Sequence, residues 1–179
     1  GVDDILTGGT GADTFVFSGT TGLEDGDLIT GTSGADVIQL NNTAGAVTAE
    51  ADFDDIATVT NITVKDNDGG NAATAQAIGL TISAIAETTA QTITIDASAI
   101  TDSNDILTVT NSAASTTTLF NITGGAGADI IAGSNAVDTI VGGSGADSIT
   151  GNVGADILTG GAGADNFVYA TTTDITSGS

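Results

Sequence analysis

Aspartate is the residue type whose spacing in this sequence could do chemistry. Between residues 124 and 168 every nine-residue unit has an aspartate at its sixth place: Asp129, Asp138, Asp147, Asp156 and Asp165. The chain has no histidine, no cysteine and a single lysine against 23 acidic residues. Carboxylates without nitrogen or sulfur ligands suit a hard divalent cation such as calcium, so this spacing points to metal binding.

The units around these aspartates define the elements that must position them. They read GGAGADIIA, GSNAVDTIV, GGSGADSIT, GNVGADILT and GGAGADNFV. Glycine at the first, second and fourth places permits a tight turn, and the three residues after the aspartate can form a short strand. Side chains alternate along a strand, so the eighth place points inward while the seventh and ninth point outward. The inward residues are Ile131, Ile140, Ile149, Leu158 and Phe167.

Two consecutive units make one coil, with a turn at each end. Stacked coils form a parallel β-roll with strands about 4.8 Å apart, and aspartates one coil apart lie one above another at its edges. Two bare carboxylates about 5 Å apart repel by roughly 3 kcal/mol at an effective dielectric constant near 20. Repulsion along both edges opposes folding, whereas a divalent cation between coils reverses the sign of the interaction.

The same frame returns near the N-terminus. GGTGADTFV begins at Gly8, and GLEDGDLIT followed by GTSGADVIQ covers residues 22–39. Residues 17–21 interrupt the nine-residue phase, so these aspartates can pair across coils only if that stretch loops out. The sequence leaves open whether two further pairs form: Asp4 with Asp27, and Asp13 with Asp36.

The units resemble the glycine-rich nonapeptide GGxGxDxUx of the calcium-binding RTX (repeats-in-toxin) proteins. The resemblance implies that each calcium ion lies between coils, bound by two aspartates and by backbone carbonyls of the glycine-rich turns. It implies three such sites in the C-terminal run: Asp129 with Asp147, Asp147 with Asp165, and Asp138 with Asp156. The implied glycine positions are Gly124, Gly125, Gly127, Gly142, Gly143, Gly145, Gly151, Gly154, Gly160, Gly161 and Gly163.

One unit departs from this pattern. GSNAVD, residues 133–138, lacks the second and fourth glycines. Because Ala136 and Val137 adopt positive φ only at an energetic cost, we expect a strained turn or a weaker site at Asp138.

Residues 40–123 are rich in Thr and Ala and poor in the nonapeptide motif. Apolar and polar residues alternate in segments such as IATVTNITV and QTITIDAS, which is typical of strands, and no helical period persists. The simplest architecture is all-β: a right-handed parallel β-solenoid whose larger coils lead into a calcium-bound β-roll. We divide the chain into an RTX-type end block (1–39), Thr/Ala-rich solenoid coils (40–123), an RTX-type β-roll (124–168) and an exit segment to a next module (169–179).

Composition excludes several classes of function. The net charge of −22 opposes binding to nucleic acid or to an anionic membrane surface. No apolar run is long enough to cross a bilayer as a helix, so we expect no membrane insertion. A chain without histidine or cysteine has no Ser-His or Cys-His pair and no zinc site of the usual kind, so we expect no enzymatic activity.

The sequence favours a calcium-stabilised structural module of a secreted bacterial surface-layer, extracellular filament or adhesin protein, whose Thr/Ala-rich RTX coils it resembles. VDDILTGGTGADTFVF, which begins at Val2, also matches GADILTGGAGADNFVY, which ends at Tyr169. The match fits a longer modular solenoid, and it equally fits a common ending of roll blocks that implies no tandem module. We expect an extracellular or cell-surface location, with self-assembly through identical subunits or neighbouring modules. Cell-surface polysaccharide is a further candidate partner. Two alternatives are the RTX segment of a type I-secreted enzyme whose catalytic domain is absent, and an ice- or surface-binding solenoid with threonine ladders.

Overall fold

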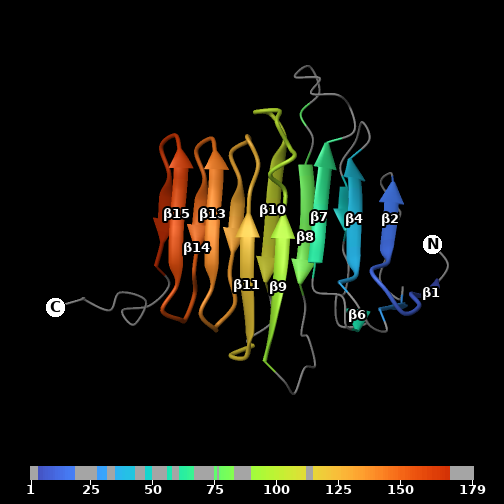
Figure 1. The fold of residues 1–179 in the computed structure, drawn as a ribbon. Coiled ribbons are helices and arrows are strands. Elements are labelled where there is room, and N and C mark those ends of the chain that lie inside the picture. Colours follow the sequence, from blue (N-terminus) through green and yellow to red (C-terminus); the bar gives the residue numbers. More distant parts are fainter. Residues whose placement is uncertain are drawn as a thin grey trace.

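The computed structural model describes residues 4–18, 28–31, 35–42, 47–49, 56–57, 61–66, 75, 77–82, 90–111 and 115–169 of the chain. Within these ranges every regular element is a β-strand. The same ranges contain nothing helical with the length and apolar character that a membrane span needs. The strands stack along one axis, with the N-terminal strands at one end and the C-terminal strands at the other (Figure 1).

The strands form three sheets in which every pairing is parallel. The seven-stranded sheet consists of β2 (Thr14–Ser18), β4 (Val37–Asn42), β7 (Asn61–Asp66), β9 (Gln91–Asp96), β11 (Thr118–Thr123), β13 (Thr139–Ser144) and β15 (Ile157–Ala162). The six-stranded sheet consists of β5 (Val47–Ala49), β8 (Ala77–Ile82), β10 (Ile106–Asn111), β12 (Ile130–Ala132), β14 (Ser148–Thr150) and β16 (Asn166–Val168). The three-stranded sheet consists of β1 (Ile5–Thr7), β3 (Leu28–Thr30) and β6 (Ile56–Ala57).

Successive strands alternate between two layers. From β7 to β16 each strand of the seven-stranded sheet is followed in the chain by a strand of the six-stranded sheet, so the chain winds as a coil (Figure 1). Each strand inside a sheet pairs with its equivalents one coil before and one coil after, and the strands at the sheet ends pair with one neighbour. This arrangement is a parallel β-solenoid and confirms the all-β fold expected from the sequence.

Coil length changes along the solenoid. In the β-roll Asn121 lies beside Thr139, so one coil consists of two nine-residue units, as expected. Between β7 and β9 Asn61 lies beside Thr94, so the coil there is almost twice as long. The ladder runs without a break from β4 to β7 and from β11 to β13, so the larger coils and the roll share one stack. The division of the chain into separate blocks stays a prediction.

Strand length also alternates within the roll. β12, β14 and β16 each have three residues, as the sequence predicts, whereas β13 and β15 have six. The longer strands arise because the ladder continues into the glycine-rich turn, where Gly143 pairs with Gly161 and Ser144 with Ala162. The prediction of three-residue strands is therefore wrong for this side of the roll.

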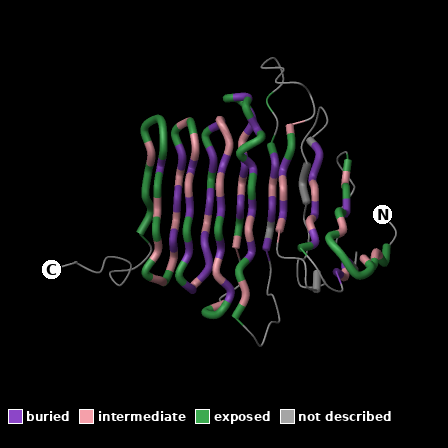
Figure 2. Tube along the Cα trace, viewed as in Figure 1, coloured by how far each residue is buried: buried purple, intermediate pink, exposed green. Residues whose placement is uncertain are grey.

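Two rows of apolar side chains run along the core between the layers, and further buried residues such as Ile78, Leu107 and Phe120 lie beside them. Buried residues recur along the strands of both layers (Figure 2). Strand register places one row in the seven-stranded sheet: Phe15, Ile38, Ile62, Ile95, Ile122, Ile140 and Leu158. It places the other in the six-stranded sheet: Leu80, Val109, Ile131, Ile149 and Phe167. All these side chains are buried except those of the final coil, where Leu158 is partly buried and Phe167 is 36% exposed. The predicted inward position of the eighth residue of each unit is confirmed. Most of this thin core is aliphatic, and its buried aromatic residues are Phe15 and Phe120.

Neighbouring isoleucines in β12 provide a test of this core. Ile131 is 1% exposed and Ile130 is 53% exposed. We expect Ile131→Ala to lower the free energy of unfolding by about 2–5 kcal/mol, because it leaves a cavity in a continuous row. Ile130→Ala should cost less than about 1 kcal/mol. Urea unfolding of both variants at one calcium concentration measures the difference, and equal losses would contradict the assigned register.

Candidate metal centre

The aspartates of the roll lie in the turns immediately before its strands. Asp129, Asp147 and Asp165 precede β12, β14 and β16, while Asp138 and Asp156 precede β13 and β15. The structure brings all three predicted pairs together through a repeated backbone hydrogen bond. In each pair the N–H of the earlier aspartate donates to Oδ1 of the later one: Asp129 to Asp147 at 2.8 Å, Asp147 to Asp165 at 3.1 Å, and Asp138 to Asp156 at 2.9 Å.

The second carboxylate oxygen binds the aspartate's own turn. Gly125 N–H donates to Asp129 Oδ2 at 2.8 Å, and Ser134 N–H donates to Asp138 Oδ2 at 2.6 Å. Each of these carboxylates therefore fixes its own turn and also contacts the preceding coil. The preceding coils contain no aspartate at the matching place, where Leu107 and Phe120 donate their N–H groups to Oδ1 of Asp129 and Asp138.

The N-terminal block repeats this pattern once. Asp13 N–H donates to Asp36 Oδ1 at 2.9 Å, and Gly9 N–H donates to Asp13 Oδ2 at 2.8 Å. The pair that the sequence left open is therefore brought together. Phe17 and Ser18 do not loop out, however, because both belong to β2 and pair with β4. Asp4 is exposed, and its expected partner Asp27 lies outside the described residues.

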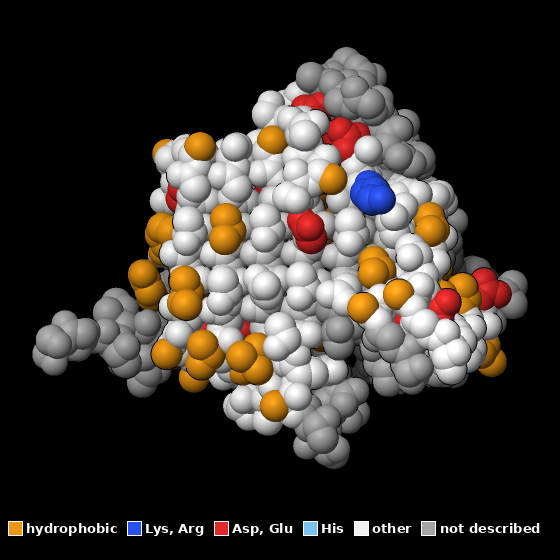
Figure 3. Space-filling model, viewed as in Figure 1, with side chains coloured by type: hydrophobic (Ala, Val, Ile, Leu, Met, Phe, Trp, Pro, Cys, Tyr) orange, Lys and Arg blue, Asp and Glu red, His pale blue; other side chains and the backbone are white. Residues whose placement is uncertain are grey.

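Four of these aspartates are buried although the chain has almost no cation to neutralise them. Asp36, Asp129, Asp138 and Asp147 are each at most 2% exposed. The single lysine of the chain, Lys65, is the only basic side chain in the view of Figure 3 and is exposed on β7. Burial of a carboxylate without a counter-charge is unfavourable, so these turns require a cation from outside the chain.

The pKa values of three of the carboxylates reflect this burial. Burial raises the pKa of Asp129 to about 6, against the hydrogen bonds from Leu107 and Gly125, and the charge of Asp147 adds to the increase. Burial likewise raises the pKa of Asp138 and Asp147, with smaller contributions from the charges of Asp156 and Asp165. The folded turns thus favour a bound positive charge, either a proton or a metal ion.

The turns have oxygen-lined space that only glycine leaves open. A Cβ atom on Gly142 would overlap the Asp147 carboxylate and the carbonyl of Gly160. One on Gly145, whose φ is +120°, would overlap the carbonyl of Gly127. Of the remaining glycines implied by the motif, Gly151 and Gly154 lie in the turn between β14 and β15 at the other edge of the roll. The others belong to the same edge as Gly142 and Gly145: Gly124, Gly125, Gly143, Gly161 and Gly163.

One buried oxygen fits a metal ion directly. Asp147 Oδ2 is buried and accepts no hydrogen bond. Asp147 is also the aspartate that stands between two others, Asp129 and Asp165. Nowhere in the described ranges do three or more acidic side chains gather around a possible metal position. An ion at these edges would therefore take two carboxylates and complete its coordination with backbone carbonyls or water, as calcium commonly does.

The unit without the second and fourth glycines, residues 133–138, forms its turn differently from what the sequence predicts. Ala136 and Val137 do not have positive φ, since Asn152, at 66°, is the one non-glycine residue in the described ranges that does. Ser134 takes the second place instead, and its Oγ donates to Asp138 at 3.0 and 3.1 Å while accepting the N–H of Ala136 at 2.9 Å. The expected strain is absent for this reason. The weaker site stays a prediction, now because Ser134 binds the oxygens that an ion would need.

Two polar residues of this edge escaped the sequence interpretation. Ser134 holds the Asp138 carboxylate, and Asn152 Nδ2 donates to the carbonyl of Gly133 at 2.7 Å across the coils. Both occupy the second place of their units, where the other three units have glycine. A polar side chain at a glycine position of the repeat was the signal that could have identified them.

Parallel coils with stacked turn carboxylates and glycine-lined carbonyl oxygens define a calcium-binding β-roll. A family model described as the RTX calcium-binding nonapeptide repeat matches four segments, residues 2–18, 21–42, 121–136 and 133–167. These segments are RTX repeats, which confirms the resemblance seen in the sequence, and RTX repeats bind calcium. No curated protein and no solved structure matches the chain.

The raised pKa values predict how the calcium-free chain depends on pH. Asp129 has an ordinary pKa of 3.8 and a folded value of about 6, so protonation favours the folded state. Its contribution, about 3 kcal/mol, is present below pH 4 and is lost as the pH rises through 6. We expect calcium-free protein to gain β-structure between pH 7.5 and pH 4, measured by circular dichroism after exhaustive removal of calcium. Asp129→Asn should weaken this pH dependence, and an identical titration for both proteins would contradict the assignment.

Proposed function

We propose that the chain is a calcium-stabilised structural module of a secreted bacterial surface-layer, extracellular filament or adhesin protein. The observation that carries the proposal is the unbroken ladder from β2 to β15, which joins both sets of RTX repeats through the larger coils. A compact segment that only assists secretion needs no such extended connection. The turn carboxylates are already employed in holding coils together, and without histidine or cysteine in the chain we propose no catalytic role.

Secretion follows from the same electrostatics. In a cytosol with scarce calcium, the acidic chain lacks the cations that its buried carboxylates require, so it stays unfolded and suited to export. Outside the cell, calcium binds the folded state and drives folding, because the free energy of metal binding becomes free energy of folding. We therefore propose an extracellular location.

The C-terminal end of the solenoid supports a further part of the proposal, assembly through neighbouring modules. β15 and β16 end their sheets within the described residues, so each leaves one edge unpaired there. The same coil exposes Ile157, Val168 and Tyr169, by 62%, 38% and 52%. Unpaired strand edges beside apolar side chains are suited to a further coil, from an identical subunit or from a next module. Cell-surface polysaccharide is a second candidate partner.

Assembly can be tested with one variant and one matched control. Val168→Asp adds a charge to the last strand, whereas Val137→Asp adds one to an exposed turn away from that end. We expect light scattering in millimolar calcium to show assembly of wild-type protein and of Val137→Asp, with loss of assembly in Val168→Asp. A folded, calcium-loaded wild-type protein that stays monomeric with its native flanks present would overturn the proposal.

The alternative is an RTX segment of a type I-secreted enzyme, which the repeats themselves favour. The sequence of the whole protein discriminates, because that alternative requires a catalytic domain beyond residues 1–179. An ice-binding role is less supported, since a flat face needs a threonine pair in constant register. In the described strands Thr92 and Thr94 lie beside Leu119 and Asn121 instead.

A further inference from the structure

The turn between β9 and β10 extends the row of glycine turns beyond the RTX repeats. Ala97 N–H donates to the carbonyl of Thr123 at 2.9 Å, and Ala126 N–H donates to the carbonyl of Ile100 at 3.0 Å. A Cβ atom on Gly127 would overlap the carbonyl of Asp105, just as one on Gly145 would overlap the carbonyl of Gly127. Asp105 thus occupies the place in this coil that the fourth glycine occupies in the roll.

Two acidic side chains of this turn are buried. Asp102 is 4% exposed and Asp105 is 0% exposed. Asp102 shapes the turn with its Oδ1 and its carbonyl, which accept the N–H groups of Asn104 at 2.9 Å and Asp105 at 3.2 Å. The other oxygen, Asp102 Oδ2, is buried and accepts no hydrogen bond.

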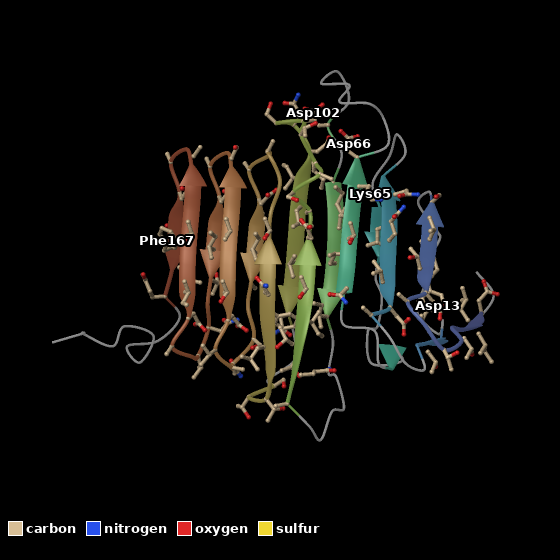
Figure 4. All side chains as sticks on the ribbon, in the orientation of Figure 1. Asp13, Lys65, Asp66, Asp102 and Phe167 are labelled. Atoms are coloured by element: carbon tan, nitrogen blue, oxygen red, sulfur yellow. The ribbon has the colours of Figure 1, made fainter. Side chains whose placement is uncertain are left out.

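The chain offers this turn no positive charge. Lys65 is the single basic residue of the sequence and is exposed on β7, while Asp102 lies in the turn between β9 and β10 (Figure 4). A buried carboxylate oxygen without a donor is unfavourable, and a hard cation bound by oxygen removes that penalty. Neither Asp102 nor Asp105 lies in a GGxGxD unit, and the RTX family model matches neither.

We propose that the turn Ile100–Asp105 binds a calcium ion outside the RTX repeats, held by the carboxylates of Asp102 and Asp105. Backbone carbonyls or water complete its coordination, since two carboxylates alone leave a calcium ion under-coordinated. The ion lies at the junction between the larger coils and the roll. The row of stacked aspartates formed by Asp165, Asp147 and Asp129 ends at this junction. One coil before Asp129, the equivalent position is occupied by Leu107. A calcium ion bound by this turn stabilises the same edge of the solenoid one coil beyond the last RTX aspartate.

Isosteric substitution tests the site. Asp102→Asn removes the charge and keeps an oxygen for the Asn104 hydrogen bond. Asp96→Asn is the matched control, because Asp96 is exposed and accepts the N–H of Ser98 at 3.0 Å in the same turn region. Calcium bound per chain, measured by equilibrium dialysis, should fall by one ion in Asp102→Asn and stay at the wild-type number in Asp96→Asn. An unchanged number in folded Asp102→Asn overturns the proposal.

Crystals of wild-type protein grown in calcium provide a second test that does not depend on a variant folding. Anomalous diffraction should show a calcium peak beside Asp102 and Asp105 as well as peaks between the paired aspartates of the roll. Peaks in the roll without one at this turn overturn the proposed site and leave the proposed function intact. Absence of every peak would overturn both.

Discussion

Removal of calcium should abolish the cooperative unfolding transition of this protein at neutral pH, together with most of its β-sheet circular dichroism signal. Asp36, Asp129, Asp138 and Asp147 are buried with no basic partner available in the sequence beyond one lysine. A site occupied at one hundred times its dissociation constant stabilises the fold by about 2.7 kcal/mol, so three sites contribute roughly 8 kcal/mol. A whole domain is commonly stable by only about 5–15 kcal/mol, so we expect calcium to supply most of the stability.

The experiment compares thermal unfolding in millimolar calcium, in excess chelator and after calcium is restored. Magnesium at the same concentration is the control ion, because it requires a smaller and more regular coordination shell than carbonyl-rich turns provide. We expect magnesium to restore little structure and calcium to restore all of it. A chelated protein that keeps its transition at neutral pH would show that the buried carboxylates are tolerated without metal.

Substitution at Asp147 should be the most damaging single change to the metal centre. Asp147 stands between Asp129 and Asp165, and its Oδ2 is buried without a hydrogen bond. Asp147→Asn keeps an oxygen for the Asp129 N–H but removes charge from two implied sites. We expect the variant to bind two fewer calcium ions and to lose roughly 5 kcal/mol of calcium-dependent stability, twice the value of one site at one hundred times its dissociation constant.

Asp165→Asn is the matched comparison, because Asp165 belongs to the final coil and to one implied pair. It should bind one fewer ion and lose about half as much stability. Calorimetric titration gives the number of ions, and chemical unfolding at fixed calcium gives the stability. Equal effects of the two substitutions would contradict a shared role for Asp147.

The roll could be predicted from sequence because its repeats fix both geometry and chemistry. An aspartate and an inward residue recur in one frame, so Asp129 and Asp147, or Ile131 and Ile149, must stack once two units make one coil. The same reasoning failed at β13, since a turn of glycines can also pair as a strand. Nothing in the repeat distinguishes those two states before neighbouring coils are in place.

For the larger coils the sequence predicts strands but neither their pairing nor the length of each coil. Alternating residues indicate strands such as β9 and β10, but the strands lack a repeat that would fix their pairing. The length of the coil from Asn61 to Thr94 depends on how much chain lies between strands, which the alternation does not determine. Asp102 and Asp105 were missed for the same reason: their proximity to the roll follows from that pairing and not from any spacing in the sequence.

Stacking coils along one axis also determines how the molecule responds to force. The backbone hydrogen bonds of a parallel solenoid run between coils, and an end coil is held by a neighbour on one side only. Tension along the axis is therefore expected to open the coils one at a time from an end. Release of one coil of the roll, such as that from Ile131 to Ile149, frees about 60 Å of extended chain, while the coil itself occupied about 4.8 Å of the axis. The longer coil from Asn61 to Thr94 frees roughly 110 Å. We therefore expect this protein to lengthen under load in discrete steps of unequal size, with work dissipated at each step before the chain is fully extended.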